Sequence, residues 1–261
     1  MFSRPAQHGN WHSVFDASAE NALRGCGVRR EASNTIRFVL EDLLPPIIRD
    51  TALFRMFAGA VFRGVGDAAT FRKRAPFLSE QEYLSFYREW RGPHEETDNS
   101  AQCLNRIAKE IVGRSVCDVG CGSGFLVRYI RDNSPAKPKR VVGVDIVAPA
   151  LPENVGIEFF EGNAEKLPFA DKAFDTVVCT HVIEHILDYR KALAELRRIT
   201  RTRLIIVVPK EREAVYTFNP HFNFFPYTHS FLRAMIPVPK RHVCVTLGRD
   251  IYYREDVAND S

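Results

Sequence analysis

Short β-branched runs alternate with longer segments of helical apolar spacing over residues 101–210. Strands that alternate with helices in this way form a parallel sheet covered by helices, so the chain is expected to have an α/β fold. The predicted helices are 125–132 and 188–200, and the predicted strands are 115–119, 140–145, 157–161, 176–180 and 203–208. Pro149 and Pro152 lie between the second and third runs, so the crossover there is expected to be short or irregular.

The flanking regions suggest a division into residues 1–100, a helical N-terminal extension or lid, and residues 101–261, the main domain. Helical periodicity occurs at 35–44, 50–62 and 79–90, and Ser79 with Glu82 predicts a capping box at the last of these. Beyond the last run, the region 211–236 is rich in aromatic residues and ends in a predicted helix at 228–236. Residues 242–247 and 250–254 are expected to form a hairpin around Gly248.

Composition narrows the class of protein. The net charge of +4 is dispersed among acidic residues, and the basic clusters 72–74 and 197–203 are expected to be solvated faces, which disfavours nucleic acid as a partner. No apolar run reaches the roughly 18 residues of a membrane span, and residues 1–13 lack the apolar region of a secretory signal. The six cysteines include no Cys-x-x-Cys pair and are expected to be reduced core residues of a cytoplasmic protein.

A glycine-rich loop follows the first predicted strand. Glycines at positions 120, 122 and 124 lie between this strand and a helix, where bare backbone N–H groups can meet a ligand closely. A dinucleotide-binding loop would place a glycine where this chain has Phe125, which argues against nicotinamide cofactors. Asp145 ends the second strand about twenty residues later, where a carboxylate can accept both hydroxyls of an adenosine ribose.

Five stretches of the sequence resemble the class I S-adenosylmethionine-dependent methyltransferases, in particular their small-molecule, type 11-like group, and they occur in the same order as in that family. The resemblance covers residues 115–209, about two-fifths of the chain, and rests on residues 118–124, 144–145, 162–169, 174–178 and 181–185. It implies a Rossmann-like fold with a mainly parallel seven-stranded sheet, and S-adenosylmethionine as the cofactor.

The resemblance also implies residue roles. The glycine loop would face the methionine end of the cofactor, Asp145 the ribose, Asn163 the adenine amino group and Ala164 the adenine ring. The family more often has Asp where this chain has Asn163, so somewhat weaker cofactor binding is expected because an amide oxygen accepts without charge. The expected cofactor-binding residues are Asp118, Gly120, Cys121, Gly122, Gly124, Asp145, Ile146, Asn163, Ala164, Thr180 and His181.

The candidates for chemistry follow the fourth and fifth strands. Methyl transfer mainly requires that an acceptor be held about 3 Å from the methyl group, and a base is needed only if the acceptor must lose a proton. His181 is the first candidate to line the transfer site, and the alternative is a polar residue that only packs beside the cofactor. His221 or His229 is expected to face the acceptor, with an aromatic core corner as the alternative. His181 and His221 are therefore the catalytic candidates, and Glu184 and His185 are expected to begin the next helix.

Residues 181–185 also resemble the Glu-x-x-Glu-His stretch of metal-assisted O-methyltransferases of quinone biosynthesis and of small-RNA methyltransferases, with His181 replacing the first Glu. His181, Glu184 and His185 are plausible ligands, but metal-free relatives share the Glu-His pair, so no metal site is assigned.

The predicted reaction is methylation of O, N or C in a small molecule or a glycan or secondary-metabolite precursor. The alternatives are a metal-assisted O-methyltransferase and a non-catalytic cofactor-binding protein. A nucleic-acid methylase is disfavoured, because an Asn-Pro-Pro-Tyr or Asp-Pro-Pro-Tyr motif is missing.

Overall fold

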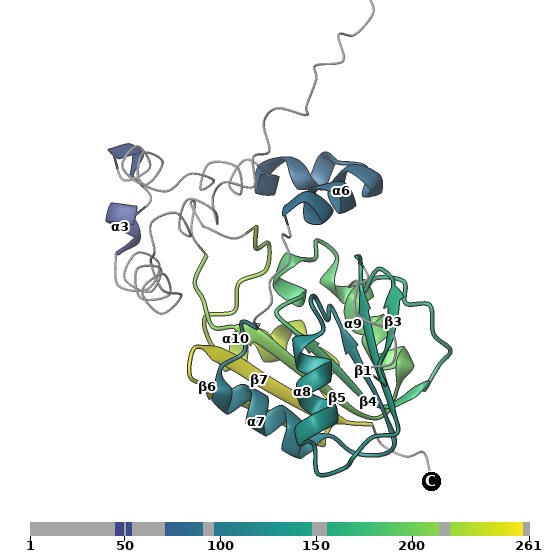
Figure 1. Ribbon diagram of the computed structural model, residues 1–261. Helices are drawn as coiled ribbons and strands as arrows, with labels where there is room; N and C mark the ends of the chain where they lie inside the picture. The colour runs from purple at the N-terminus through teal and green to yellow at the C-terminus, as the bar shows by residue number, and fades with distance from the viewer. Residues whose placement is uncertain are drawn as a thin grey trace, which may run out of the picture.

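A seven-stranded sheet forms the centre of the protein (Figure 1). The computed structural model describes residues 45–49, 51–53, 71–90, 97–147, 156–213 and 220–257. The strand order is β3-β2-β1-β4-β5-β7-β6, and only β7 runs antiparallel to its neighbours. The strands are β1 Ser115–Val119, β2 Arg140–Asp145, β3 Glu158–Glu161, β4 Phe174–Thr180, β5 Thr200–Pro209, β6 His242–Leu247 and β7 Asp250–Asp256.

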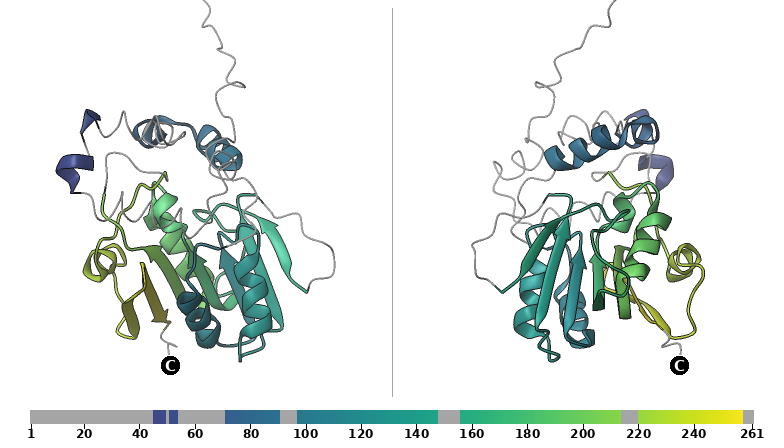
Figure 2. Two further views of the ribbon diagram at one scale, coloured as in Figure 1. Left: turned by 60° about the vertical axis from the view of Figure 1, so that its left-hand side comes forward. Right: turned by 90° about the vertical axis from the view of Figure 1, so that its right-hand side faces the viewer.

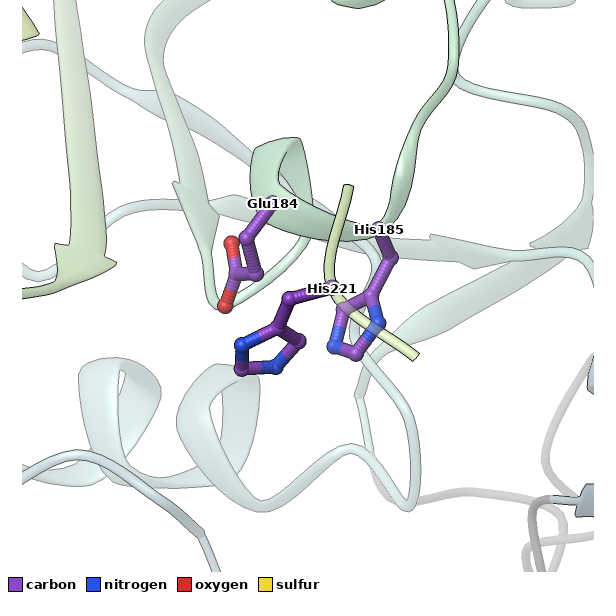
Figure 3. A group of neighbouring side chains, drawn as sticks. All are labelled: Glu184, His185 and His221. Atoms are coloured by element: carbon purple, nitrogen blue, oxygen red, sulfur yellow. The ribbon is translucent and has the colours of Figure 1, made fainter. Parts of the chain in front are cut away.

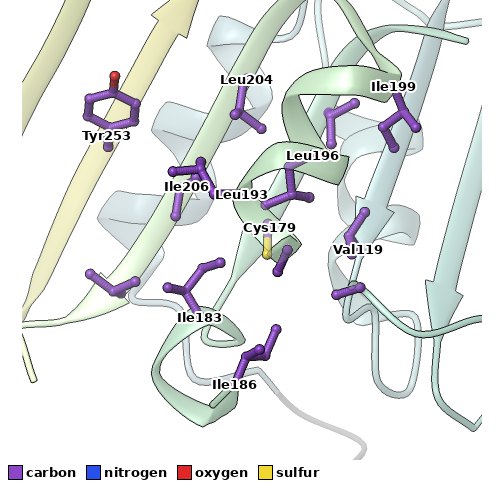
Figure 4. Packing of buried hydrophobic residues seen from close by; sticks show 14 of the residues in the cluster. Val119, Cys179, Ile183, Ile186, Leu193, Leu196, Ile199, Leu204, Ile206 and Tyr253 are labelled. Carbon is purple, nitrogen blue, oxygen red and sulfur yellow. The ribbon is translucent and has the colours of Figure 1, made fainter. Parts of the chain in front are cut away.

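The helices α7 to α10 cover the sheet on both faces. Helices α7 (Ala101–Glu110) and α8 (Phe125–Asn133) pack on one face, and α9 (Tyr189–Ile199) and α10 (Thr228–Ala234) lie on the other (Figure 1). The α9 side chains that recur at helical spacing are all buried, including Leu196 and Ile199, which pack with Leu204 of β5 (Figure 4). Burial of one apolar stripe per helix gives the three-layer α/β architecture.

The mainly parallel seven-stranded α/β fold and the closing hairpin are confirmed, with strand limits within a few residues of those predicted. Helix α7 was not predicted, although Ser100 caps it by accepting the N–H of Cys103 at 3.2 Å and Ile107 is fully buried on its apolar face. The irregular crossover predicted between β2 and β3 falls largely on residues 148–155, outside the described part of the chain.

The described part of the N-terminal region contains α3 (Pro46–Arg49), the 3₁₀ turn η3 (Ala75–Phe77) and α6 (Glu80–Trp90). Helix α6 lies across the end of the sheet at which the parallel strands finish (Figure 2). The capping box is confirmed, because Ser79 N–H donates to the Glu82 carboxylate at 2.9 Å and Glu82 N–H to Ser79 Oγ at 3.3 Å. The helix predicted at 35–44 and most of that predicted at 50–62 lie outside the described residues.

Two further expectations concern side chains. All five cysteines in the described residues are free thiols, and four of them are buried, as expected for reduced core residues. The basic cluster 197–203 differs from the expected solvated face. Arg201 is 52% exposed, but Arg197 and Arg203 are only 23% and 16% exposed and pair with Glu255 and Asp256 of β7. These arginines therefore help to attach the hairpin to the parallel sheet.

None of the described helices has the length and hydrophobicity needed to cross a bilayer.

The Asp175 carboxylate joins the start of β4 to the start of β1. It accepts hydrogen bonds from the N–H groups of Arg114 at 2.8 Å and Ser115 at 3.1 Å and from the Ser115 hydroxyl at 2.9 Å, and it pairs with Arg201. Burial alone would raise the pKa of Asp175, but these donors lower it below the ordinary value. A carboxyl whose pKa is lowered by folding stabilises the protein only while it is ionised.

Replacement of Asp175 by Ala is expected to lower the free energy of unfolding at pH 7 by about 2 to 4 kcal/mol, because several charge-assisted hydrogen bonds are lost. The contribution of Asp175 is fully present above the unfolded-state pKa of about 4 and disappears as the pH falls through the lower folded-state pKa. Urea denaturation of both proteins between pH 3 and pH 7 measures this difference. A difference that did not shrink toward low pH would contradict the assignment.

Candidate functional site

The glycine loop is built from backbone that only glycine adopts easily. Gly120, Gly122 and Gly124 have φ values of 80°, 53° and 76°, in the left-handed region. A Cβ atom on Gly120 would lie 2.1 Å from Cγ2 of Val182, so the loop also touches the segment after β4. Gly124 is the N-cap of α8, which directs N–H groups of the helix start toward the same end of the sheet. The three glycines therefore allow a tight turn between β1 and α8 at the carboxyl edge of the sheet.

Asp145 lies directly beside this loop. It is 5% exposed, ends β2, and its Oδ2 accepts the Gly122 N–H at 2.8 Å. The Gly120 and Cys121 N–H groups donate to the carbonyl oxygen of Val144 at 2.7 and 3.1 Å. The acid and the loop, predicted separately along the sequence, thus form one unit at the carboxyl end of β1 and β2, where open parallel sheets bind ligands.

The residues expected around the adenine ring occupy a turn after β3. The Asn163 side-chain oxygen accepts the Glu165 N–H at 2.9 Å, and its amide nitrogen lies 3.5 Å from a carboxylate oxygen of Glu80 on α6. Ala164 is buried in the core, and Ile146 packs against the aromatic cluster of the N-terminal region. The turn thus holds the Asn163 oxygen in place, while a bond from that oxygen to adenine stays a prediction.

The two remaining predicted cofactor contacts on β1 and β4 are enclosed by protein. Asp118 is 1% exposed within β1, and Thr180, the last residue of β4, is 9% exposed. Thr180 Oγ1 accepts a hydrogen bond at 3.0 Å from the amide of Asn99, a buried residue that precedes α7 and that the sequence did not single out. Asp118 and Thr180 are therefore buried near the carboxyl ends of the two central strands, and their contact with the cofactor stays a prediction.

His181 follows β4 in a left-handed conformation, with φ of 55°. Its Nδ1 is 3.6 Å from Glu184 Oε1, and its Nε2 is 3.8 Å from Asp250 Oδ1. Burial alone would lower the pKa of this imidazole, but the two carboxylates raise it to about 9. An imidazole whose pKa is raised by neighbouring carboxylates is a poor base at neutral pH, so these surroundings favour a lining role for His181.

Glu184 and His185 were predicted to begin the following helix, but this prediction is wrong. They lie in a separate 3₁₀ turn, η4 (Ile183–His185), and α9 starts only at Tyr189. The η4 turn brings both side chains next to His221, which is 4% exposed and contacts the Glu211 carboxylate through Nδ1 (Figure 3). His229, the other predicted acceptor-facing histidine, is exposed and stacks on Tyr227. His221 thus belongs to the site cluster, whereas its direct role in catalysis stays a prediction.

The N-terminal region also contributes to this side of the site. The hydroxyl groups of Tyr83 and Tyr87 on α6 donate to the carbonyl oxygen of His185. Phe71 and Phe222 pack with these two tyrosines. The sequence did not identify the tyrosines, because nothing in the helical pattern of residues 79–90 indicates which distant loop the helix contacts.

Comparisons with known proteins agree with this geometry. A family model described as a methyltransferase domain matches residues 117–208. A probable S-adenosylmethionine-dependent methyltransferase of Mycolicibacterium smegmatis is 29% identical over 58% of this chain and 53% of its own length. Demethylmenaquinone methyltransferase of Thermus thermophilus is 33% identical over 44% and 51%. Malonyl-[acyl-carrier protein] O-methyltransferase of Pectobacterium atrosepticum is 32% identical over 34% and 35%.

The chain spans about half the length of the first two of these relatives. The matched region runs from β1 to β5 and contains the glycine loop, Asp145 and η4. The family match, the relatives and the doubly covered parallel sheet agree with one another. Residues 117–208 of this chain therefore match the methyltransferase-domain family, and the chain is similar to S-adenosylmethionine-dependent methyltransferases over that region.

Proposed function

We propose that this chain transfers a methyl group from S-adenosylmethionine to O, N or C of a small molecule and releases S-adenosylhomocysteine. The observation that carries the proposal is the buried Asp145 carboxylate, which holds the Gly122 N–H within a left-handed glycine loop at the carboxyl edge of the sheet. An acid at the carboxyl end of the second strand, beside a glycine loop, is the arrangement in which open parallel sheets bind the ribose of an adenosine ligand.

The acceptor side is formed by groups outside the glycine loop. The ring of Tyr83 packs against those of Tyr87 and Phe222. The His185 ring of η4 contacts the rings of Tyr87 and His221. Flat aromatic walls with a few polar groups suit a small molecule that carries one reactive polar atom. The names of two relatives specify a menaquinone precursor and a malonyl thioester carrier, which differ widely, so kinship supports the methyl donor more strongly than any one acceptor. A glycan or secondary-metabolite precursor fits the same proposal.

Titration calorimetry with S-adenosylmethionine tests the donor half of this proposal, and transfer of labelled methyl groups into metabolite fractions tests the acceptor half. Saturable binding together with a labelled small molecule is the expected result. Binding without transfer to any fraction would favour a non-catalytic cofactor-binding protein. If no binding were seen, both the enzyme and the cofactor-binding protein would be excluded.

A second candidate function is a metal-assisted O-methyltransferase. It is favoured by one specific observation, the group formed by Glu184, His185 and His221. The sequence suggested His181, Glu184 and His185 as possible metal ligands. In the structure His221, and not His181, lies next to Glu184 and His185 in this group.

A further inference from the structure

Three side chains from two distant segments meet on the acceptor side of the site. Glu184 and His185 come from η4, and His221 comes from the loop between β5 and α10. Together they offer one carboxylate oxygen and two imidazole nitrogens, and these three atoms lie within 4.8 Å of one another (Figure 3). We call Glu184, His185 and His221 the Glu-His-His cluster.

The carboxylate of the cluster is buried without full compensation. Glu184 is 1% exposed, and its Oε2 has no hydrogen-bond partner among the described residues. Its other oxygen lies 3.6 Å from His181 Nδ1, which is beyond hydrogen-bonding distance. An ionised carboxylate is costly to bury unless a cation or several donors satisfy it. The environment of Glu184 therefore favours a positive charge close to Oε2.

The imidazole rings of the cluster are held in fixed orientations. The His185 and His221 ring centroids are 4.5 Å apart, with an angle of 79° between the ring planes. The Glu211 carboxylate contacts Nδ1 of His221. A carboxylate on one ring nitrogen is the usual way in which proteins orient a metal-binding histidine and raise its basicity.

Backbone hydrogen bonds bring the two segments together independently of the cluster's own side chains. The N–H groups of Phe222 and Asn223 donate to the Glu184 carbonyl oxygen at 2.7 and 3.2 Å. The Asn223 amide donates to the carbonyl oxygens of Ile183 at 2.9 Å and Ile186 at 2.7 Å. The ligand atoms are thus placed close together by the fold, and little reorganisation is needed to bind an ion between them.

We propose that Glu184, His185 and His221 bind a divalent transition-metal ion. Two imidazoles and a carboxylate suit Zn²⁺, Co²⁺ or Mn²⁺ better than Mg²⁺ or Ca²⁺, which prefer oxygen ligands. When bound, such an ion supplies a positive charge that lowers the pKa of a coordinated hydroxyl, so the proposed function is narrowed to acceptors that react through oxygen. This narrowing rests on the proposed methyl transfer, whereas the metal site itself can be tested without it.

Cobalt binding tests the site directly. The chelator-treated full chain is titrated with Co²⁺ and followed by its visible absorption spectrum, and Zn²⁺ is then added as a competitor. The wild-type chain is expected to bind a single Co²⁺ that Zn²⁺ displaces. Glu184→Gln and His221→Ala are each expected to weaken binding by about 100-fold, and Glu211→Gln by about tenfold because it only orients His221. His242→Ala, an exposed histidine on β6, is the matched control and is expected to keep the wild-type affinity.

Two results would overturn the proposal. One is a wild-type chain whose Kd for Co²⁺ is weaker than about 1 mM. The other is a Glu184→Gln variant that binds Co²⁺ as tightly as the wild type. Glu184→Gln keeps the size and shape of the side chain, so it decides the question even if circular dichroism shows that His221→Ala does not fold. Calorimetry with S-adenosylmethionine on the same samples keeps the two proposals apart, since a chain that binds the cofactor but no Co²⁺ refutes only the metal site.

Discussion

Replacement of Asp145 by Ala is expected to weaken the binding of S-adenosylhomocysteine by about 100-fold. The carboxylate is almost fully buried and accepts the Gly122 N–H, and in the proposed complex it also accepts the ribose hydroxyls. Charge-assisted hydrogen bonds contribute about 1.5 to 3 kcal/mol each, and about 2.7 kcal/mol corresponds to a 100-fold change in Kd. Titration calorimetry on both proteins measures this change.

A matched control separates the specific role of Asp145 from a general effect of charge. Asp132 is an exposed carboxylate near the end of α8, so Asp132→Ala removes the same charge away from the glycine loop and should leave the Kd unchanged. Thermal denaturation shows whether each variant is folded. A Kd for folded Asp145→Ala within about threefold of the wild type would refute the ribose assignment.

Replacement of Gly120 by Ala is expected to destabilise the protein by about 2 to 5 kcal/mol and to distort the cofactor loop. A side chain at φ of 80° costs about 1 to 2 kcal/mol. The new Cβ would lie 2.1 Å from Cγ2 of Val182, and relief of such overpacking costs about 1 to 3 kcal/mol more. Urea denaturation gives the stability, and calorimetry with S-adenosylhomocysteine gives the effect on the loop.

Two further variants separate the two causes. Gly248 also has a positive φ, of 61°, but its added Cβ would meet no atom within 4 Å, so Gly248→Ala reports the backbone strain alone. Adding Val182→Ala to Gly120→Ala removes the atom that the new Cβ meets and should recover part of the lost stability. Equal destabilisation in Gly120→Ala and Gly248→Ala, or no recovery in the double variant, would show that contact with Val182 is not the cause.

The sequence predicted the sheet and its strand limits well because these depend on local patterns. Periodic burial distinguishes strands from helices, and Ser79 with Glu82 marks a helix start through contacts within one turn. The prediction that Glu184 and His185 begin the helix after β4 was wrong, because their conformation depends on contacts far along the chain. Residues 182–186 carry apolar and acidic groups that suit a helix start, but Glu184 and His185 form a short turn clamped by bonds from Phe222 and Asn223. Those bonds come from a distant segment that no local pattern reveals.

The sequence by itself determined the α/β class, the glycine loop and its partner Asp145, because strand ends and glycines at fixed spacing place backbone and carboxylate at one edge of a parallel sheet. Only the tertiary structure decided that His221 joins Glu184 and His185, that Glu211 holds His221, and that α6 lies over them. The physical reason is that these side chains meet through the paths of loops and through the packing of the N-terminal helix. Such paths are set by long-range contacts, whereas sequence spacing reports only on neighbours within a strand or a helical turn.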